Sequence, residues 1–171
     1  MPLNDALLAV FDHELQNTRR TLERVPEGKS DWKPHPKSMA LGYLAGHLAE
    51  LAGWGAVTME TTEFDMASVP YQPFTMTSRE VLLAKFDENS AKLRAALGKA
   101  TDTDLMIPWS LKRGSEVIFS LPRVAALRSM ILNHIIHHRG QLTVYLRLND
   151  VPVPALYGPS ADEGQAGAAQ G

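Results

Sequence analysis

The chain has 171 residues, 44% of them hydrophobic, and its 17 Lys and Arg residues against 19 Asp and Glu residues give a formal charge of −2. This size and composition indicate one globular domain. The near-neutral charge provides no basic surface for DNA or RNA, so nucleic acid is not an expected partner. The absence of cysteine excludes disulfides, thiolate metal sites and a cysteine nucleophile, which leaves six histidines as candidate metal ligands.

The start of the chain lacks the basic residues and the small-residue cleavage site of a secretory signal. Histidines interrupt the most apolar regions, so no stretch approaches the roughly 18 uninterrupted apolar residues that span a bilayer. We therefore expect a soluble cytoplasmic protein that does not insert into membranes.

Four segments repeat apolar residues about every 3.6 positions, which predicts an all-α fold built as a four-helix bundle. These segments are residues 3–25, 39–60, 77–98 and 120–148. Ser38 is expected to cap the second helix, and Thr77 with Glu80 the third. Four glycines in the second helix predict close approach of a neighbouring helix or ligand.

Three features lie outside this simple pattern. Arg113 and Gly114 separate two apolar runs and favour a small hairpin. The last helix is apolar on both sides, with Leu132, Ile135, Ile136 and Leu146 opposite its main stripe, which predicts burial by a second copy of the chain. The Gly-, Ala- and Gln-rich end is expected to be mobile, so we place the domain at residues 1–159 and a flexible tail at 160–171.

The strongest chemical signal is the run NHIIHHRGQ, which begins at Asn133. Its His134 and His138 are four residues apart, which places both imidazoles on one helical face where they can share an ion. Both interrupt an inward apolar stripe, where a buried imidazole without a partner is costly. His47, toward the inward side of the second helix, is a third candidate ligand. The alternative is a set of core histidines that hydrogen-bond without a metal.

Other polar residues leave several roles open. His137 is a candidate for an alternative ligand, a residue that orients a ligand, or a surface residue. Glu14, on the inward face of the first helix, is a candidate oxygen ligand, a partner of a ligating imidazole, or a side chain that reaches outward to solvent. Arg139 is expected in an ion pair rather than at a substrate, and His13 and His35 at the surface. The three tryptophans, Trp32, Trp54 and Trp109, are expected to pack.

Three pieces of the sequence resemble the DinB family of DinB/YfiT-like metalloenzymes: GHLAE at 46–50, NHIIHHRGQL at 133–142 and VPVPALYGPSADE at 151–163. The resemblance implies a four-helix bundle with up-up-down-down connectivity and one long crossover. It also implies a divalent metal, usually nickel or zinc, held by His47, His134 and His138, and a homodimer.

Some members of the family are thiol transferases or isomerases that use bacillithiol, mycothiol or glutathione. Three imidazoles leave coordination positions for water and substrate, as catalytic sites require. We therefore expect a metal-dependent enzyme that transfers a small-molecule thiol, with a metal-dependent hydrolase, a noncatalytic metal-binding stress protein and a metal-free helical interaction module as alternatives. No catalytic residue is assigned, because Glu14, Asn17 and Tyr43 would line the site only if the first two helices face the metal.

Overall fold

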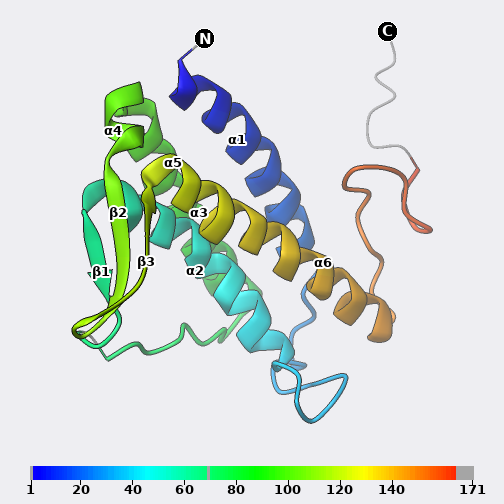
Figure 1. The fold of residues 1–171 in the computed structure, drawn as a ribbon. Helices are drawn as coiled ribbons and strands as arrows, with labels where there is room; N and C mark the ends of the chain where they lie inside the picture. The colour runs from blue at the N-terminus through cyan, green and yellow to red at the C-terminus, as the bar shows by residue number, and fades with distance from the viewer. Residues whose placement is uncertain (1, 69, 165–171) are drawn as a thin grey trace, which may run out of the picture.

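A computed structural model describes residues 2–68 and 70–164 of the chain. Its four long helices are α1 (Leu3–Leu22), α2 (Leu41–Glu60), α3 (Arg79–Lys99) and α6 (Asn133–Leu148) (Figure 1). The shorter helical elements are α4 (Asp102–Met106), α5 (Arg123–Ala126) and the π-helical turn η1 (Leu127–Leu132), and α5, η1 and α6 follow one another without a break. Within the described residues, no helix combines the length and the apolarity that crossing a membrane requires.

Two ion pairs fix the relative direction of α1 and α3. Asp12, midway along α1, accepts hydrogen bonds from Arg94, late in α3. Arg19, later in α1, donates to Asp87, earlier in α3. The two helices are therefore antiparallel.

Similar contacts orient α2. Asn89 donates to the backbone carbonyl of Ala49 at 2.8 Å, and Gly55, later in α2, lies against Leu93, later in α3. α2 and α3 are therefore parallel neighbours, joined by the long connection between residues 61 and 78.

The direction of α6 follows from its two ends. Tyr145, late in α6, donates to the backbone carbonyl of Met39, just before α2 begins. Ile131, just before α6, lies beside Gly55, late in α2. α2 and α6 are thus antiparallel, and the helices run up-down-down-up in chain order (Figure 1). The expected up-up-down-down order is wrong, because the crossover joins the second helix to the third.

A three-stranded sheet corrects the all-α expectation to a mostly helical fold. Its strands are β1 (Glu63–Asp65), β2 (Pro108–Arg113) and β3 (Glu116–Pro122). β2 and β3 pair antiparallel around Gly114, whose φ of +61° suits a glycine, so the predicted hairpin is confirmed. β1 adds in parallel to β2 and was not predicted.

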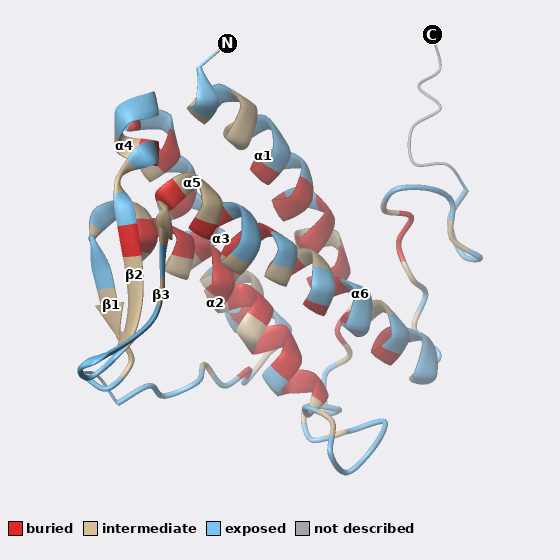
Figure 2. Cartoon of the chain, viewed as in Figure 1, coloured by how far each residue is buried: buried red, intermediate tan, exposed pale blue. Residues whose placement is uncertain are grey.

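The core lies between the four long helices and buries α2 on most of its surface (Figure 2). Gly53 and Gly55 explain the close approach of α3. A Cβ built at either position would come within 2.9 Å of the side chains of Asn89 and Leu93, respectively. The prediction of close neighbours is therefore confirmed: the neighbour is helix α3 at Gly53 and Gly55, and a connecting segment at Gly42 and Gly46, which face Ser30 and Phe74.

The helix ends shift by a few residues from their predicted positions. α2 begins at Leu41 behind an extended Ala40, so Ser38 does not cap it. The cap of α3 is Ser78, whose side chain accepts from the backbone of Val81, rather than Thr77. The last helical run begins at Arg123, since β3 continues up to that point.

The second apolar side of the last helical run is buried inside a single chain. Leu132, Ile135 and Leu146 are each 0% exposed, because α1 and α2 both pack against α6. No second copy is therefore needed to bury these three residues, whereas the fourth, Ile136, is only partly buried. The homodimer itself stays a prediction from the family resemblance.

The predicted tail begins at Ser160, and residues 165–171 of it lie outside the described residues. Within residues 160–164, Asp162 forms an ion pair with Arg147. Glu163 forms ion pairs with Arg20 at 2.8 Å and with Arg24 at 2.5 Å. The segment that follows α6 is thus attached to α1 and α6 as far as Glu163.

Candidate metal centre

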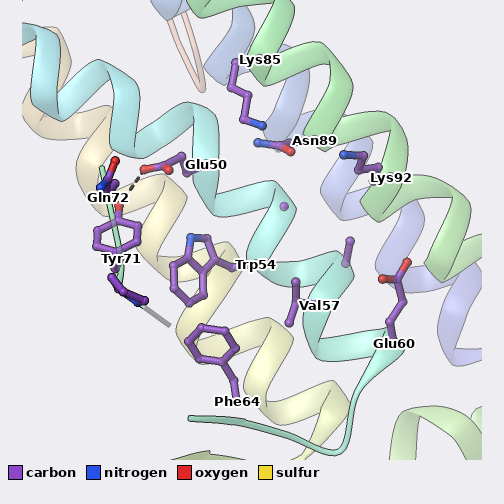
Figure 3. Close-up of a pocket in the computed structure, with 13 residues that line it drawn as sticks. Glu50, Trp54, Val57, Glu60, Phe64, Tyr71, Gln72, Lys85, Asn89 and Lys92 are labelled. Atoms are coloured by element: carbon purple, nitrogen blue, oxygen red, sulfur yellow. Dashed lines mark hydrogen bonds between the residues drawn. The ribbon is translucent and has the colours of Figure 1, made fainter. Parts of the chain in front are cut away.

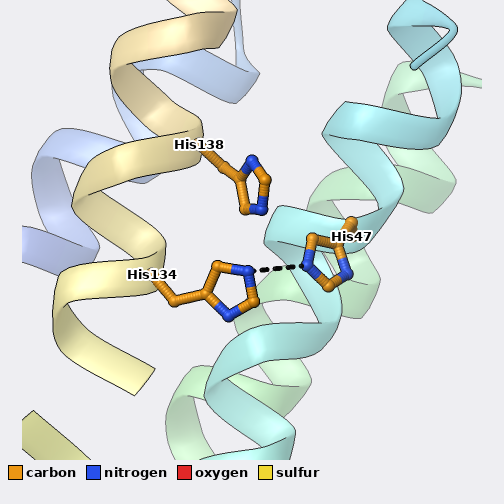
Figure 4. A group of neighbouring side chains, drawn as sticks. All are labelled: His47, His134 and His138. Carbon is orange, nitrogen blue, oxygen red and sulfur yellow. Dashed lines mark hydrogen bonds between the residues drawn. The ribbon is translucent and has the colours of Figure 1, made fainter. Parts of the chain in front are cut away.

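Three histidines from two antiparallel helices meet in the structure (Figure 4). His47 projects from α2, and His134 and His138 project from successive turns of α6. Their ring centroids are 4.6 to 5.0 Å apart. One nitrogen atom of each ring lies within 4.8 Å of those of the other two. The structure therefore brings together the three residues singled out from the sequence.

The spacing of the nitrogens suits a shared ion. The Nε2 atoms of His47 and His134 are 3.3 Å apart. Two imidazole nitrogens that bind one tetrahedral Zn²⁺ ion, each at about 2.0–2.1 Å, lie roughly 3.3–3.4 Å from each other. Three imidazole donors without thiolate or carboxylate suit zinc or nickel better than magnesium or calcium. The donor set thus fits a divalent transition metal.

The hydrogen bond on the outer side of the His138 ring favours the tautomer that binds metal through Nε2. The Nδ1 atom of His138 lies 2.6 Å from the side-chain oxygen of Gln141. The ring of His134 hydrogen-bonds the backbone of Met130, in the π-helical turn before it. A ring that donates from Nδ1 keeps the lone pair of Nε2 free. The Nδ1 atom of His47 is buried without a partner within the described residues.

Burial keeps the three imidazoles neutral at pH 7. Burial, followed by the proximity of His134 and His138, lowers the pKa of His47 from 6.5 to about 4. Burial is also the largest cause that lowers the pKa of His134 and of His138. Neutral imidazole is the form that ligates a metal, so the site needs no deprotonation to accept an ion.

The other sequence candidates lie elsewhere. His137 is exposed beside His138, and His13 and His35 are exposed as predicted. Glu14 is buried, yet its carboxylate accepts from Arg139 at 2.5 Å rather than from a ligand histidine. That contact confirms the ion pair predicted for Arg139. It also excludes the predicted role of Glu14 as a side chain that reaches outward to solvent.

Asn17 and Tyr43 differ in their place relative to the cluster, because α2 carries both Tyr43 and His47 whereas α1 carries Asn17. Asn17 hydrogen-bonds His13 on α1, and Tyr43 is 40% exposed on α2. Gln141 and the backbone of Met130 were missed from the sequence. The spacing of three and four residues from the ligand histidines was the available signal for both.

Comparison with known proteins identifies the family of the chain. The family model described as the DinB superfamily matches residues 11–142. The chain belongs to the DinB superfamily. It is 24% identical over 159 residues to the protein YrdA of Bacillus subtilis strain 168, covering 93% of this chain and 90% of the relative.

Two solved structures share the fold. A DinB-like protein from Bacillus cereus ATCC 10987 superposes with a TM-score of 0.67 at 22% identity, covering 90% of this chain and 97% of that one. The DinB-like protein YjoA from Bacillus subtilis has a TM-score of 0.69 at 21% identity, covering 87% and 96%. At this identity the likeness establishes the fold alone.

Proposed function

We propose that the protein is a metal-dependent enzyme that binds nickel or zinc through His47, His134 and His138 and transfers a small-molecule thiol to an electrophile. The observation that carries the proposal is the convergence of three neutral imidazoles, with one nitrogen of each ring within 4.8 Å of the others and the Nε2 atoms of His47 and His134 3.3 Å apart. A divalent ion held by three imidazoles lowers the pKa of a thiol or water that it binds.

The residues of the chain set the conditions for that chemistry. His138 is held by Gln141, so its ring needs little rearrangement when an ion binds. The chain has no cysteine, so the thiol comes from a small molecule. A metal-dependent hydrolase uses the same residues, with water in place of the thiol.

The first test is the metal content of untagged protein, measured by elemental mass spectrometry for the wild type and for His134→Ala. We expect about one ion per chain in the wild type and loss of that ion in the variant. His137→Ala is the matched control, because it removes an exposed imidazole from the same helix and should keep the metal. Metal absent from the reloaded wild type would overturn the site.

The second test separates transfer from hydrolysis. The metal-loaded protein is given a low-molecular-weight thiol and a model electrophile, and the conjugate is measured by mass spectrometry. Conjugation that is lost in His134→Ala supports S-transfer. Hydrolysis of an ester probe without conjugation would contradict it and favour the hydrolase.

A noncatalytic role as a metal-binding protein is the second candidate, because the three histidines would join α2 to α6 through one ion. An ion that binds only the folded chain raises the melting temperature by mass action. This candidate therefore predicts a large drop in melting temperature on chelation in the wild type and none in His134→Ala. Turnover by the loaded protein would contradict it.

The homodimer and the cytoplasmic location belong to the same proposal. Val144 and Leu148, on the solvent face of α6, are 57% and 56% exposed and offer an apolar contact to a second copy. Light scattering should then give twice the chain mass of 18.8 kDa, and Val144→Asp with Leu148→Asp should give the monomer. A monomeric wild type would remove the dimer from the proposal.

A further inference from the structure

A groove of about 770 Å³ crosses α2 on the side that faces α3 and the connection from β1 (Figure 3). We call it the α2–α3 groove. Its floor includes the small residues Gly53 and Ala56 together with Val57. The volume lies within the range of small-molecule sites, about 300–1,000 Å³.

One wall of the groove is aromatic. The Trp54 ring is 5.0 Å from that of Phe64 at an angle of 74°, and 5.8 Å from that of Tyr71 at 63°. These edge-on neighbours hold the indole in place. The hydroxyl of Tyr71 donates to Glu50 at 2.7 Å, which ties the connection from β1 to α2. The wall thus offers a fixed flat surface to an apolar ligand.

The opposite wall is cationic. It is formed on α3 by Lys85, Asn89 and Lys92. The buried Asn89 is held by its hydrogen bond to the backbone of Ala49. Lys92 donates to Glu88 at 2.6 Å, whereas the ammonium of Lys85 is 3.7 Å from Glu88. Lys85 thus forms only a long ion pair with a carboxylate that already binds Lys92, so its ammonium is the more loosely held of the two and can turn to an anionic ligand.

The acidic residues of the groove stand apart from Lys85. Glu50 is on the aromatic side, where it accepts from Tyr71, and Glu60 lies at the end near Lys92 (Figure 3). A ligand that lies across the floor with its flat part on Trp54 therefore meets an ammonium group at its other end. Charge complementarity favours an anionic group there.

The groove adjoins the metal centre through α2. Along α2, Glu50 comes three residues after His47, and Trp54 comes seven residues after His47. The three side chains therefore share one row of the helix. A molecule in the groove has its aromatic part within about two turns of the ligand histidine.

We propose that the α2–α3 groove binds the non-reacting part of the substrate, an aromatic or flat apolar group against Trp54 that carries a carboxylate or similar anion at Lys85. The assignment to the substrate rests on the proposed metal-dependent function. The binding of such an anion by the groove does not depend on it.

The test is a titration of the metal-free protein with 2-naphthoate, followed by NMR of the three tryptophan indole N–H signals. The Trp54 signal is assigned by its loss in Trp54→Phe. We expect saturable movement of that signal, about tenfold weaker binding in Lys85→Gln, and unchanged binding in the matched control Lys37→Gln. The cation 2-naphthylmethylamine, of similar shape, should bind much more weakly.

Equal affinity for the amine, equal affinity of Lys85→Gln, or movement of the other indoles alone would overturn the proposal. Naphthoate binding by His134→Ala with wild-type affinity supports the groove whether or not the metal site is correct. Conversely, if the protein binds metal but does not bind naphthoate, the groove proposal is wrong and the metal site is not affected.

Paramagnetic Ni²⁺ tests whether the groove serves the metal centre. When the wild type is loaded, the proton signals of bound naphthoate should broaden, and they should stay sharp with His134→Ala. Sharp signals in a loaded wild type that binds naphthoate would place the ligand away from the metal and overturn its assignment to the substrate.

Discussion

Arg139 and Glu14 form an ion pair in which the two side chains are 1% and 8% exposed. The guanidinium also donates to the backbone carbonyl of Glu14 and to Thr18, and Tyr157 completes the group by donating to the Glu14 carboxylate. Because these contacts satisfy both charges, loss of one partner leaves the other buried and unpaired.

Arg139→Met is therefore expected to lower the free energy of unfolding by about 3–5 kcal/mol. Glu14→Gln combined with Arg139→Met should cost less than the sum of the single changes, because the double variant buries no unpaired charge. Urea denaturation of the three variants measures the coupling. Arg94→Gln, which breaks an exposed pair between α1 and α3, is the control and should change stability little. Additive effects at residues 14 and 139 would contradict the coupling.

The histidine cluster makes the metal-free protein sensitive to acid. The folded chain holds the pKa of His47 at about 4, against 6.5 for the ordinary value, so between these values the unfolded chain binds the extra proton. Stability is therefore full above pH 6.5 and falls as the pH drops toward 4. Urea denaturation in a chelator at pH 7, 6 and 5 should give a steeper loss for the wild type than for His47→Gln. His35→Gln, which changes an exposed histidine, is the control and should lose stability with falling pH as the wild type does. If His47→Gln lost stability just as steeply, the acid sensitivity would not come from His47.

At the scale of single residues, the sequence predicted that the candidate ligand histidines of α6 lie together because a helical repeat fixes which side chains share a face. His134 and His138 needed only the spacing of four within one helix. The groove residues Phe64, Tyr71 and Lys85 lie on three separate segments, and nothing in their local sequence says that these segments meet. Trp54 was expected to pack, and it does so while leaving one surface in the groove.

At the scale of elements, two glycines in helices should respond in opposite directions to one substitution. A Cβ at Gly53 of α2 would lie 2.9 Å from the buried side chain of Asn89, whereas one at Gly140 of α6 meets nothing within 4 Å. Gly53→Ala should destabilise the protein because Asn89 must move and strain its bond to Ala49. Gly140→Ala should stabilise it by about 0.5–1 kcal/mol through helix propensity. Thermal denaturation compares them, and equal signs would contradict the packing of α2 on α3.

The four helices were predicted because their apolar repeat is long and regular, and the hairpin because Arg113 and Gly114 divide two apolar runs. β1 was missed because three residues are too few to show a period, and its pairing with β2 depends on a segment more than 40 residues away. The relative direction of the helices could not be predicted from the apolar pattern either. An apolar stripe says that a helix packs but not which way its neighbour runs.

At the scale of the whole molecule, the chain after α6 returns across the bundle and joins its first helix to its last. Glu163 pairs with Arg20 and Arg24 of the α1 region and accepts from the backbone of Ala155, which is itself fully buried. Asp162 pairs with Arg147 of α6. From these contacts we predict that the folded unit extends past residue 159, the boundary predicted from the sequence, to Glu163.

Two truncations decide where the folded unit ends. A chain that ends after Gly164 keeps both acidic residues, whereas one that ends after Pro159 loses them and leaves the three arginines without their carboxylates. Because the two chains differ only by residues 160–164, the difference in their melting temperatures isolates this segment. We expect the shorter chain to melt a few degrees lower, and Glu163→Gln in the longer chain to reproduce part of the loss. Equal melting temperatures would show that the segment contributes nothing and would restore the boundary at residue 159.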